Sequence, residues 1–185
     1  DNARMPDDPR PRLSRRHLIE GLCVAPLALA TTVRASRPTD IRVVEVTHAF
    51  EHHTYRAPYM FGGRSVDRVT ILNVQVRVRT GAGVEAWGFG SMTLGNAWAF
   101  PKVSQDDGLN AMMALAESFR AVTAACDEEG HPLDLWRVLE PAYLLAAAAL
   151  GPTRNLAHPI PKLCTLVVAS PFDAAIHDAY GKAFG

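Results

Sequence analysis

The clearest pattern in the chain is a strict alternation of polar and apolar residues from position 73 to position 79. Apolar side chains stand at 74, 76 and 78, and polar ones stand at 73, 75, 77 and 79. Successive side chains of a strand point to opposite faces of the sheet, so this pattern predicts a half-buried strand with one solvated face. The whole strand is expected to span residues 69–79.

The flanking segments predict two further strands. Residues 41–50 are rich in β-branched side chains and are expected to form a first strand. The sequence Thr80-Gly81-Ala82-Gly83 is typical of a tight hairpin, and it leads into a third strand at 84–90. Residues 51–64 contain Pro58, Gly62 and Gly63 and are predicted to be a long loop. A second loop, rich in glycine and aromatic residues, is predicted for 91–103.

Helical spacing takes over in the second half of the chain. Ser104 or Asp106 can cap a helix that runs to about Cys126. A second helix is predicted for 133–150 and a third for 163–183, with a kink or restart at Pro141 and a break or bend at Pro171. The inner side of the first helix is expected to carry Leu109, Met112, Met113, Leu115, Ala116 and Phe119.

Strands that precede helices, rather than alternating with them, indicate the α+β class. We therefore expect a three-stranded antiparallel meander followed by a small helical bundle. Trp87 and Trp136 are expected in its core. A length of 185 residues leaves no room for a (β/α) barrel, which needs roughly 200 residues or more.

Composition narrows the function classes further. Nineteen basic and nineteen acidic side chains cancel, so the chain has no basic footprint for nucleic acid. Its three cysteines lack metal-ligand spacing. Cys126 and Cys164 could form a disulfide after export or remain two free thiols.

The first 35 residues are interpreted as a disordered leader with an export signal. Residues 14–19, Ser-Arg-Arg-His-Leu-Ile, resemble the core of a twin-arginine signal, and an uncharged, mostly apolar run follows from Gly21 to Val33. That run is too short to span a bilayer comfortably, so no stable membrane anchor is expected. The predicted location is periplasmic or secreted. An apolar surface helix is the alternative for this segment.

The end of the chain carries a resemblance to a known family. Residues 172–185 read Phe-Asp-Ala-Ala-Ile-His-Asp-Ala-Tyr-Gly-Lys-Ala-Phe-Gly. This resembles the F-D-x-A-x-x-D-x-x-G-K-A-x-G helix that leads into the barrel of enolase-superfamily enzymes of the mandelate racemase and muconate lactonizing type. Residues 80–90 resemble the T-x-x-G-x-x-G-x-G hairpin of the same family. The resemblance covers roughly residues 40–185, the family's N-terminal capping domain.

The resemblance implies a role in Mg²⁺-dependent proton abstraction next to a carboxylate. Racemases, dehydratases and cycloisomerases of this family act in that way on acid sugars or similar small carboxylates, and a homo-oligomer is expected. The family's metal ligands and bases lie on barrel strands, so no catalytic residue, metal ligand or cofactor is assigned to this chain. Mg²⁺ is implied only for the full-length enzyme. The chain is expected to be an isomerase or lyase fragment without its barrel and inactive alone.

The resemblance also implies a lid that the capping domain folds over the substrate, built from residues 51–64 and 91–103. Apolar and aromatic side chains with few polar groups are typical of such a surface. The alternative is that these side chains pack on the domain's own helices or on a dimer partner. Arg56 could pair with a substrate carboxylate. The candidate substrate-capping residues are Tyr55, Arg56, Met60, Phe61, Met92, Asn96 and Trp98.

Other polar residues are interpreted as structural. Asp173 and Asp178 lie about 140° apart around a helix and cannot easily share a cation. His48, His52 and His53 are interpreted as a partly exposed cluster rather than a metal site. An exported stand-alone α+β module that binds a small ligand or a protein is the alternative function.

Overall fold

Three antiparallel strands form the first half of the folded chain in this computed structural model, which describes residues 37–61 and 63–185. They are β1 (Ile41–Phe61), β2 (Arg64–Thr80) and β3 (Glu85–Thr93), and their order in the sheet is β1-β2-β3. The export signal and leader predicted for residues 1–35 lie outside the described residues.

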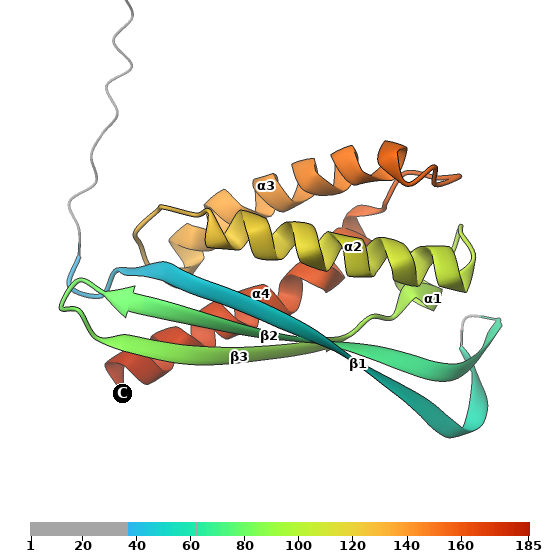
Figure 1. Ribbon diagram of the computed structural model, residues 1–185, viewed down its shortest axis with the longest axis horizontal. Coiled ribbons are helices and arrows are strands. Elements are labelled where there is room, and N and C mark those ends of the chain that lie inside the picture. Colours follow the sequence, from blue (N-terminus) through green and yellow to red (C-terminus); the bar gives the residue numbers. More distant parts are fainter. Residues whose placement is uncertain (1–36, 62) are drawn as a thin grey trace, which may run out of the picture. The chain divides into compact units, whose positions relative to one another are not determined.

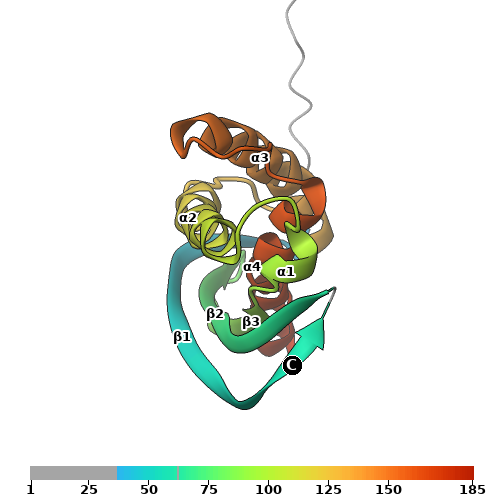
Figure 2. The same ribbon diagram turned by 90° about the vertical axis from the view of Figure 1, so that its right-hand side faces the viewer.

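Within the described residues, four helices follow the strands and lie on one side of the sheet (Figure 1). They are α1 (Asn96–Ala99), α2 (Gln105–Ala124), α3 (Pro132–Thr153) and α4 (Lys162–Phe184). Helix α4 covers β3 and β2, and α2 covers β1. Helix α3 packs on α2 and α4 and forms the outermost layer, as the end view shows (Figure 2). The predicted α+β meander followed by a helical bundle is confirmed.

The core lies between the sheet and the helices. The apolar residues of the alternating segment, Val74, Val76 and Val78, are completely buried and face the helices. The polar residues between them face solvent or are half-buried, so the predicted half-buried strand is confirmed. The inner side of α2 is also as expected, with Met112, Leu115, Ala116 and Phe119 buried and Leu109 and Met113 partly buried.

The prediction of a loop at 51–64 is wrong, because both strands continue through it. β1 pairs with β2 as far as the Phe61–Arg64 pair. Pro58 is accommodated by a register irregularity between Thr54 and Tyr59. A proline on an edge strand withholds one N–H without breaking the rest of the ladder. Gly63 adopts a φ of 77°, a value that glycine reaches without strain.

The second predicted loop, 91–103, is also partly wrong. β3 runs on to Thr93, and the single helical turn α1 follows it. The tight hairpin before β3 is confirmed, because the N–H of Gly83 donates to the Thr80 carbonyl at 2.9 Å. The cap of α2 is confirmed as well: the Ser104 hydroxyl accepts the N–H of Asp107 at 3.0 Å.

The sequence predicts a break or a bend of the last helix at Pro171, and the break is wrong, because α4 continues through this residue. Pro171 has no N–H to give to the carbonyl of Val167 one turn earlier. The hydroxyl of Ser170 donates to that carbonyl instead, at 2.9 Å. Helix α3 likewise passes through Pro141 without a restart.

Trp87 was expected in the core and is instead 43 % exposed. It lies opposite Arg77 on the solvated face of the sheet, and the guanidinium carbon of Arg77 lies 5.5 Å from the indole centroid. Glu45 and Glu85 bind the same guanidinium, each at 2.7 Å. Trp136 packs against the core and is partly buried.

Two glycines of β3 allow α4 to touch the sheet. A Cβ atom on Gly88 would lie 2.0 Å from the carbonyl oxygen of Ala175, and one on Gly90 would lie 2.0 Å from that of Pro171. Real Cβ atoms do not approach oxygen that closely, so the helix can lie at this distance only over glycine. The hairpin motif and the C-terminal helix motif are therefore the two sides of one contact.

Candidate functional site

The distal half of the β1–β2 hairpin bends toward α1 and the first turn of α2, and a cavity of about 170 Å³ lies between them. We call it the hairpin cavity. The two segments predicted as a lid, separated by some thirty residues of sequence, both contribute to its wall. The lining residues are Tyr55, Tyr59, Phe61, Val66, Arg68, Val69, Thr70, Thr93, Leu94, Gly95, Asn96, Ala97, Trp98, Gln105, Asp106 and Leu109.

Polar contacts hold the tip of the hairpin against the helices. The guanidinium of Arg64 donates to the carbonyl oxygens of Val103, at 3.2 Å, and of Pro101. The side-chain amide of Gln105 donates to the carbonyl of Ser65 at 3.2 Å. These contacts join β2 to the segment around the start of α2, and one of them is made by the cavity-lining residue Gln105.

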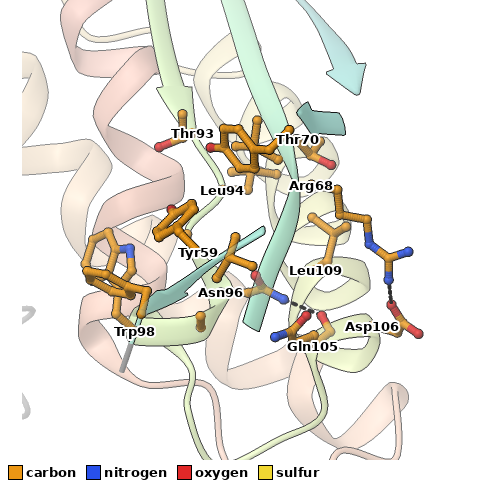
Figure 3. Close-up of a pocket in the computed structure, with 16 residues that line it drawn as sticks. Tyr59, Arg68, Thr70, Thr93, Leu94, Asn96, Trp98, Gln105, Asp106 and Leu109 are labelled. Atoms are coloured by element: carbon orange, nitrogen blue, oxygen red, sulfur yellow. Dashed lines mark hydrogen bonds and ion pairs between the residues drawn. The ribbon is translucent and has the colours of Figure 1, made fainter. Parts of the chain in front are cut away.

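Most polar side chains of the cavity wall are already bound to protein groups. Arg68 forms an ion pair with Asp106 at 2.8 Å. Thr70 is hydrogen-bonded to His52 at 2.9 Å. The amide of Asn96 donates to the backbone carbonyl of Gln105. Figure 3 shows the Arg68–Asp106 pair on one side of the cavity and the Trp98 ring on the other.

Aromatic rings form the rest of the wall. Tyr55 and Tyr59 meet edge to face with their ring centroids 5.4 Å apart. Partial burial and the neighbouring Tyr59 hydroxyl raise the pKa of Tyr55. The Tyr55 phenol is therefore neutral at physiological pH. Both rings present apolar surface to the cavity.

The structure brings four of the seven candidate capping residues to this cavity: Tyr55, Phe61, Asn96 and Trp98. The other three lie elsewhere. Arg56 is exposed and does not line the cavity. Met60 is 69 % exposed at the tip of the hairpin, and Met92 lies on β3, partly buried against the core.

Several lining residues were not among the candidates, notably Tyr59, Arg68 and Gln105. Arg68 was missed because the second strand was expected to begin at residue 69. The Gly62-Gly63 pair between two β-rich runs is itself a hairpin signal. A hairpin turn at Gly62-Gly63 extends both strands and places Arg68 opposite Thr54, as the register shows.

The three histidines do not form one cluster. The His48 side chain is only 7 % exposed, and its Nε2 lies 3.2 Å from the Glu117 carboxylate of α2. His53 is exposed beside Glu51. Among residues 37–61 and 63–185, no group of three or more histidine, cysteine or acidic side chains could hold a metal ion. The described residues therefore do not fit a Mg²⁺ site, and no chemical step is assigned to a metal within them.

The acidic residues of α4 have structural partners. One carboxylate oxygen of Asp178 accepts the backbone N–H of Phe89 at 2.8 Å and binds Lys182 at 2.7 Å. These contacts lower the pKa of Asp178, the Lys182 bond most strongly. Asp173 pairs with His177 at 3.3 Å, and burial raises the pKa of this carboxyl.

Both described cysteines are free thiols. Cys164 is buried between helices, and burial raises its pKa to about 12. Cys126 is half-buried, and burial raises its pKa too. Neither thiol has the thiolate character that nucleophilic chemistry requires. None of the helices in the described ranges combines the length and the hydropathy that crossing a bilayer requires.

No family model and no curated protein matches the chain. Several solved structures do. An L-talarate/galactarate dehydratase from Salmonella typhimurium LT2, liganded with Mg and L-lyxarohydroxamate, is 18% identical with a TM-score of 0.47; the match covers 80% of this chain and 32% of that one. A mandelate racemase/muconate lactonizing enzyme-like protein from Rubrobacter xylanophilus is 17% identical with a TM-score of 0.45, over 78% and 31%.

An enolase from Bradyrhizobium, complexed with magnesium and mandelic acid, is 16% identical with a TM-score of 0.45, over 79% of this chain and 33% of that one. The chain thus spans about a third of the length of the solved structures that it matches. The names of the last two belong to the family type that the sequence motifs resemble.

Proposed function

We propose that residues 40–185 are the substrate-capping domain of an enolase-superfamily enzyme, a racemase, dehydratase or cycloisomerase that acts on a small carboxylate. One observation carries the proposal: two segments far apart in the sequence, 51–61 and 93–98, meet at one aromatic cavity. A capping domain needs such a surface, because it has to cover the substrate and exclude water.

The motif residues support the same proposal, because they have a physical task in this fold. Gly88 and Gly90 admit α4 to the sheet, and Asp178 of α4 binds the backbone of β3. The contact holds β3 in place, and β3 leads directly to α1 and the cavity. In this proposal Mg²⁺ and the proton-transferring groups belong to a barrel outside residues 40–185, and this domain alone turns over no substrate.

Two tryptophans of similar exposure allow a matched test in the full-length protein. Trp98 lines the cavity and is 39 % exposed, whereas Trp87 lies on the outer face of the sheet and is 43 % exposed. Loss of the Trp98 ring contact should lower kcat/KM about tenfold, equivalent to about 1.4 kcal/mol. Trp98→Ala should show this loss and Trp87→Ala should not. Equal activity of both variants would contradict the capping role.

The second candidate is a stand-alone binding module, and the same cavity favours it. A ligand-binding module would bind its ligand with the 185-residue chain alone, whereas a capping domain contributes only part of a binding site. Calorimetric titration of the chain with small carboxylates separates the two: affinity in the micromolar range supports the module.

We further propose that residues 1–35 direct export to the periplasm or the exterior, and that the full-length protein is a homo-oligomer. The support for export is the Arg15-Arg16 pair followed by an uncharged, mostly apolar run. Replacing both arginines with lysine should keep the protein in the cytoplasmic fraction. Unchanged export of that variant would contradict the twin-arginine assignment. A monomer in sedimentation analysis of the full-length protein would contradict the proposed homo-oligomer.

A further inference from the structure

We infer that the outward side of α3 is an interface between two copies of this chain, which pair through antiparallel α3 helices. The inference gives the homo-oligomer proposed above a specific interface, and it does not depend on the capping role. None of the residues that carry it lines the hairpin cavity.

The interface is a continuous apolar stripe on the exposed side of α3. Its six residues follow helical spacing and extend over about 21 Å of the helix axis. Leu145 is 72 % exposed and Val138 is 48 % exposed. We call this surface the α3 stripe, and its members are Val138, Pro141, Leu145, Ala148, Ala149 and Pro152.

Helix α3 is apolar on both sides, although it forms the outermost layer (Figure 2). Its inner side, where Leu135 and Leu139 are buried, packs on α2 and α4. Residues 141–152 include no charged residue, and the one polar side chain among them, Tyr143, is buried and bound to Thr123. A helix at the surface normally carries polar residues on its outer side, and one that is apolar all round is normally covered. The α3 stripe therefore fits an apolar partner surface.

The shape of the stripe is complementary to itself in an antiparallel pair. When Leu145 of one copy lies opposite Ala148 of the other, the twofold axis repeats the same contact, so a large side chain meets a small one twice. The same register places Pro141 of one copy opposite Pro152 of the other. Ala149 also lies on this side and adds no bulk that would hold the two helices apart.

The charges at the two ends of the stripe identify a second copy as the partner. Glu140 lies just before the uncharged segment, and the exposed Arg154 ends the helix. The antiparallel register brings Arg154 of each copy within one residue of Glu140 of the other, whereas a parallel pair would place like charges together. Glu140 binds Lys162 of its own chain at 3.0 Å. Its carboxylate has two oxygens and can accept a second cation as well.

A groove at the end of α3 extends the apolar surface. It has a volume of about 750 Å³ and lies between the last turns of α3 and the segment that leads into α4. Leu156 and Ile160 line it together with two members of the stripe. The one lysine of its lining is Lys162, which Glu140 neutralises. A second copy that covers this groove therefore buries no unpaired ammonium group.

Sedimentation of the 185-residue chain over a range of concentrations tests the inference. A single pair of helices forms a small interface, so we expect a dimer with a Kd of about 10 µM. Leu145→Glu places a charge in the middle of the stripe and should raise that Kd at least tenfold. Leu133→Glu is the matched control, because Leu133 is 62 % exposed on the same helix but lies about 120° around its axis from Leu145. It should leave the Kd unchanged, and urea unfolding checks that both variants fold.

Arg154→Ala tests the orientation of the pair without changing the stripe. In the antiparallel pair it removes an attraction and should raise the Kd about threefold, whereas in a parallel pair it would remove a repulsion and lower the Kd. A chain that stays monomeric at every concentration would overturn the inference. Equal weakening by Leu145→Glu and Leu133→Glu, or a lower Kd of Arg154→Ala, would overturn it too.

The full-length protein separates this interface from the proposed function. Leu145→Glu should lower the mass of its oligomer, and Leu133→Glu should not. A full-length oligomer that Leu145→Glu leaves intact would overturn the α3 interface and leave the homo-oligomer standing. The capping role is decided separately, by the turnover of Trp98→Ala.

Discussion

Single residues decide how closely the last helix approaches the sheet. Gly88 and Gly90 carry no Cβ, and the backbone of α4 occupies the space where one would be. Asp178 then joins the two elements by accepting the N–H of Phe89 on the edge strand β3. An edge strand exposes unpaired backbone groups, so this bond also removes one donor that could recruit another chain.

Gly88→Ala should destabilise the 185-residue chain by about 2 to 3 kcal/mol, because the added methyl overlaps the backbone of α4 and forces the elements apart. Gly181→Ala is the control: Gly181 lies in α4 itself, and no atom outside that helix's own backbone lies within 4 Å of its Cβ position. This variant should be neutral or stabilising by up to about 1 kcal/mol. Urea unfolding measures both. Similar stabilities for the two variants would show that α4 does not depend on the glycine contact.

Asp178→Asn should lower stability at pH 7 and have less effect in acid. The folded state lowers the pKa of Asp178 below its ordinary value of 3.8. The contribution of the carboxylate is therefore complete above that value and is lost as the pH falls through the lowered pKa. The carboxylate is partly exposed, so its contribution is at most about 1 kcal/mol. A wild-type-to-variant difference that grows between pH 5 and pH 2 would contradict this assignment.

At the scale of elements, the β1–β2 hairpin is the part that reaches the candidate site. Its base is held by the core, whereas its distal half is exposed along β1. Near the tip, Arg64 and Gln105 tie β2 to the segment around the start of α2. The hairpin cavity thus depends on a few polar contacts near the tip of the long β1–β2 hairpin.

Arg64→Ala should free the tip of the β1–β2 hairpin from the segment before α2. Without the bonds to the carbonyls of Val103 and Pro101, amide hydrogens of residues 59–66 should exchange at least tenfold faster, while those of 72–78 remain protected. Arg56→Ala, on the exposed part of the same hairpin, serves as the control and should change little. Hydrogen exchange followed by mass spectrometry reports both. Unchanged protection in Arg64→Ala would contradict this role of Arg64 and would mean that apolar contacts alone hold the hairpin tip against the helices.

The sequence predicted the elements well and their ends poorly. Alternation located the buried face of β2, and the Ser104 cap located the start of α2, because both signals depend on local chemistry. Pro58 suggests a loop and Pro171 a break or a bend, but the strand and the helix both continue through them: an edge strand and a serine hydroxyl, respectively, accommodate the missing N–H groups. Trp87 was misplaced because hydrophobicity alone does not show on which face of a strand a residue lies.

At the scale of the whole molecule, the fold brings both predicted lid segments to one cavity, but only some of the single residues named within them. Hairpin pairing and the β3–α1 connection bring residues 51–61 and 93–98 to one cavity. The sequence predicts these two segments together only because the family resemblance implies a lid. Whether Arg56 or Tyr59 faces the cavity depends on the register irregularity at Pro58, which no local pattern reveals.

The measurement that tests the capping role most directly is the coding sequence beyond the codon for Gly185. The proposed function predicts an open frame of some 200 codons that encodes barrel strands, with a Lys-x-Lys strand and then acidic residues at successive strand ends, as the family resemblance implies. A stop codon directly after Gly185 would contradict the capping role and would leave the hairpin cavity as the site of a stand-alone binding module.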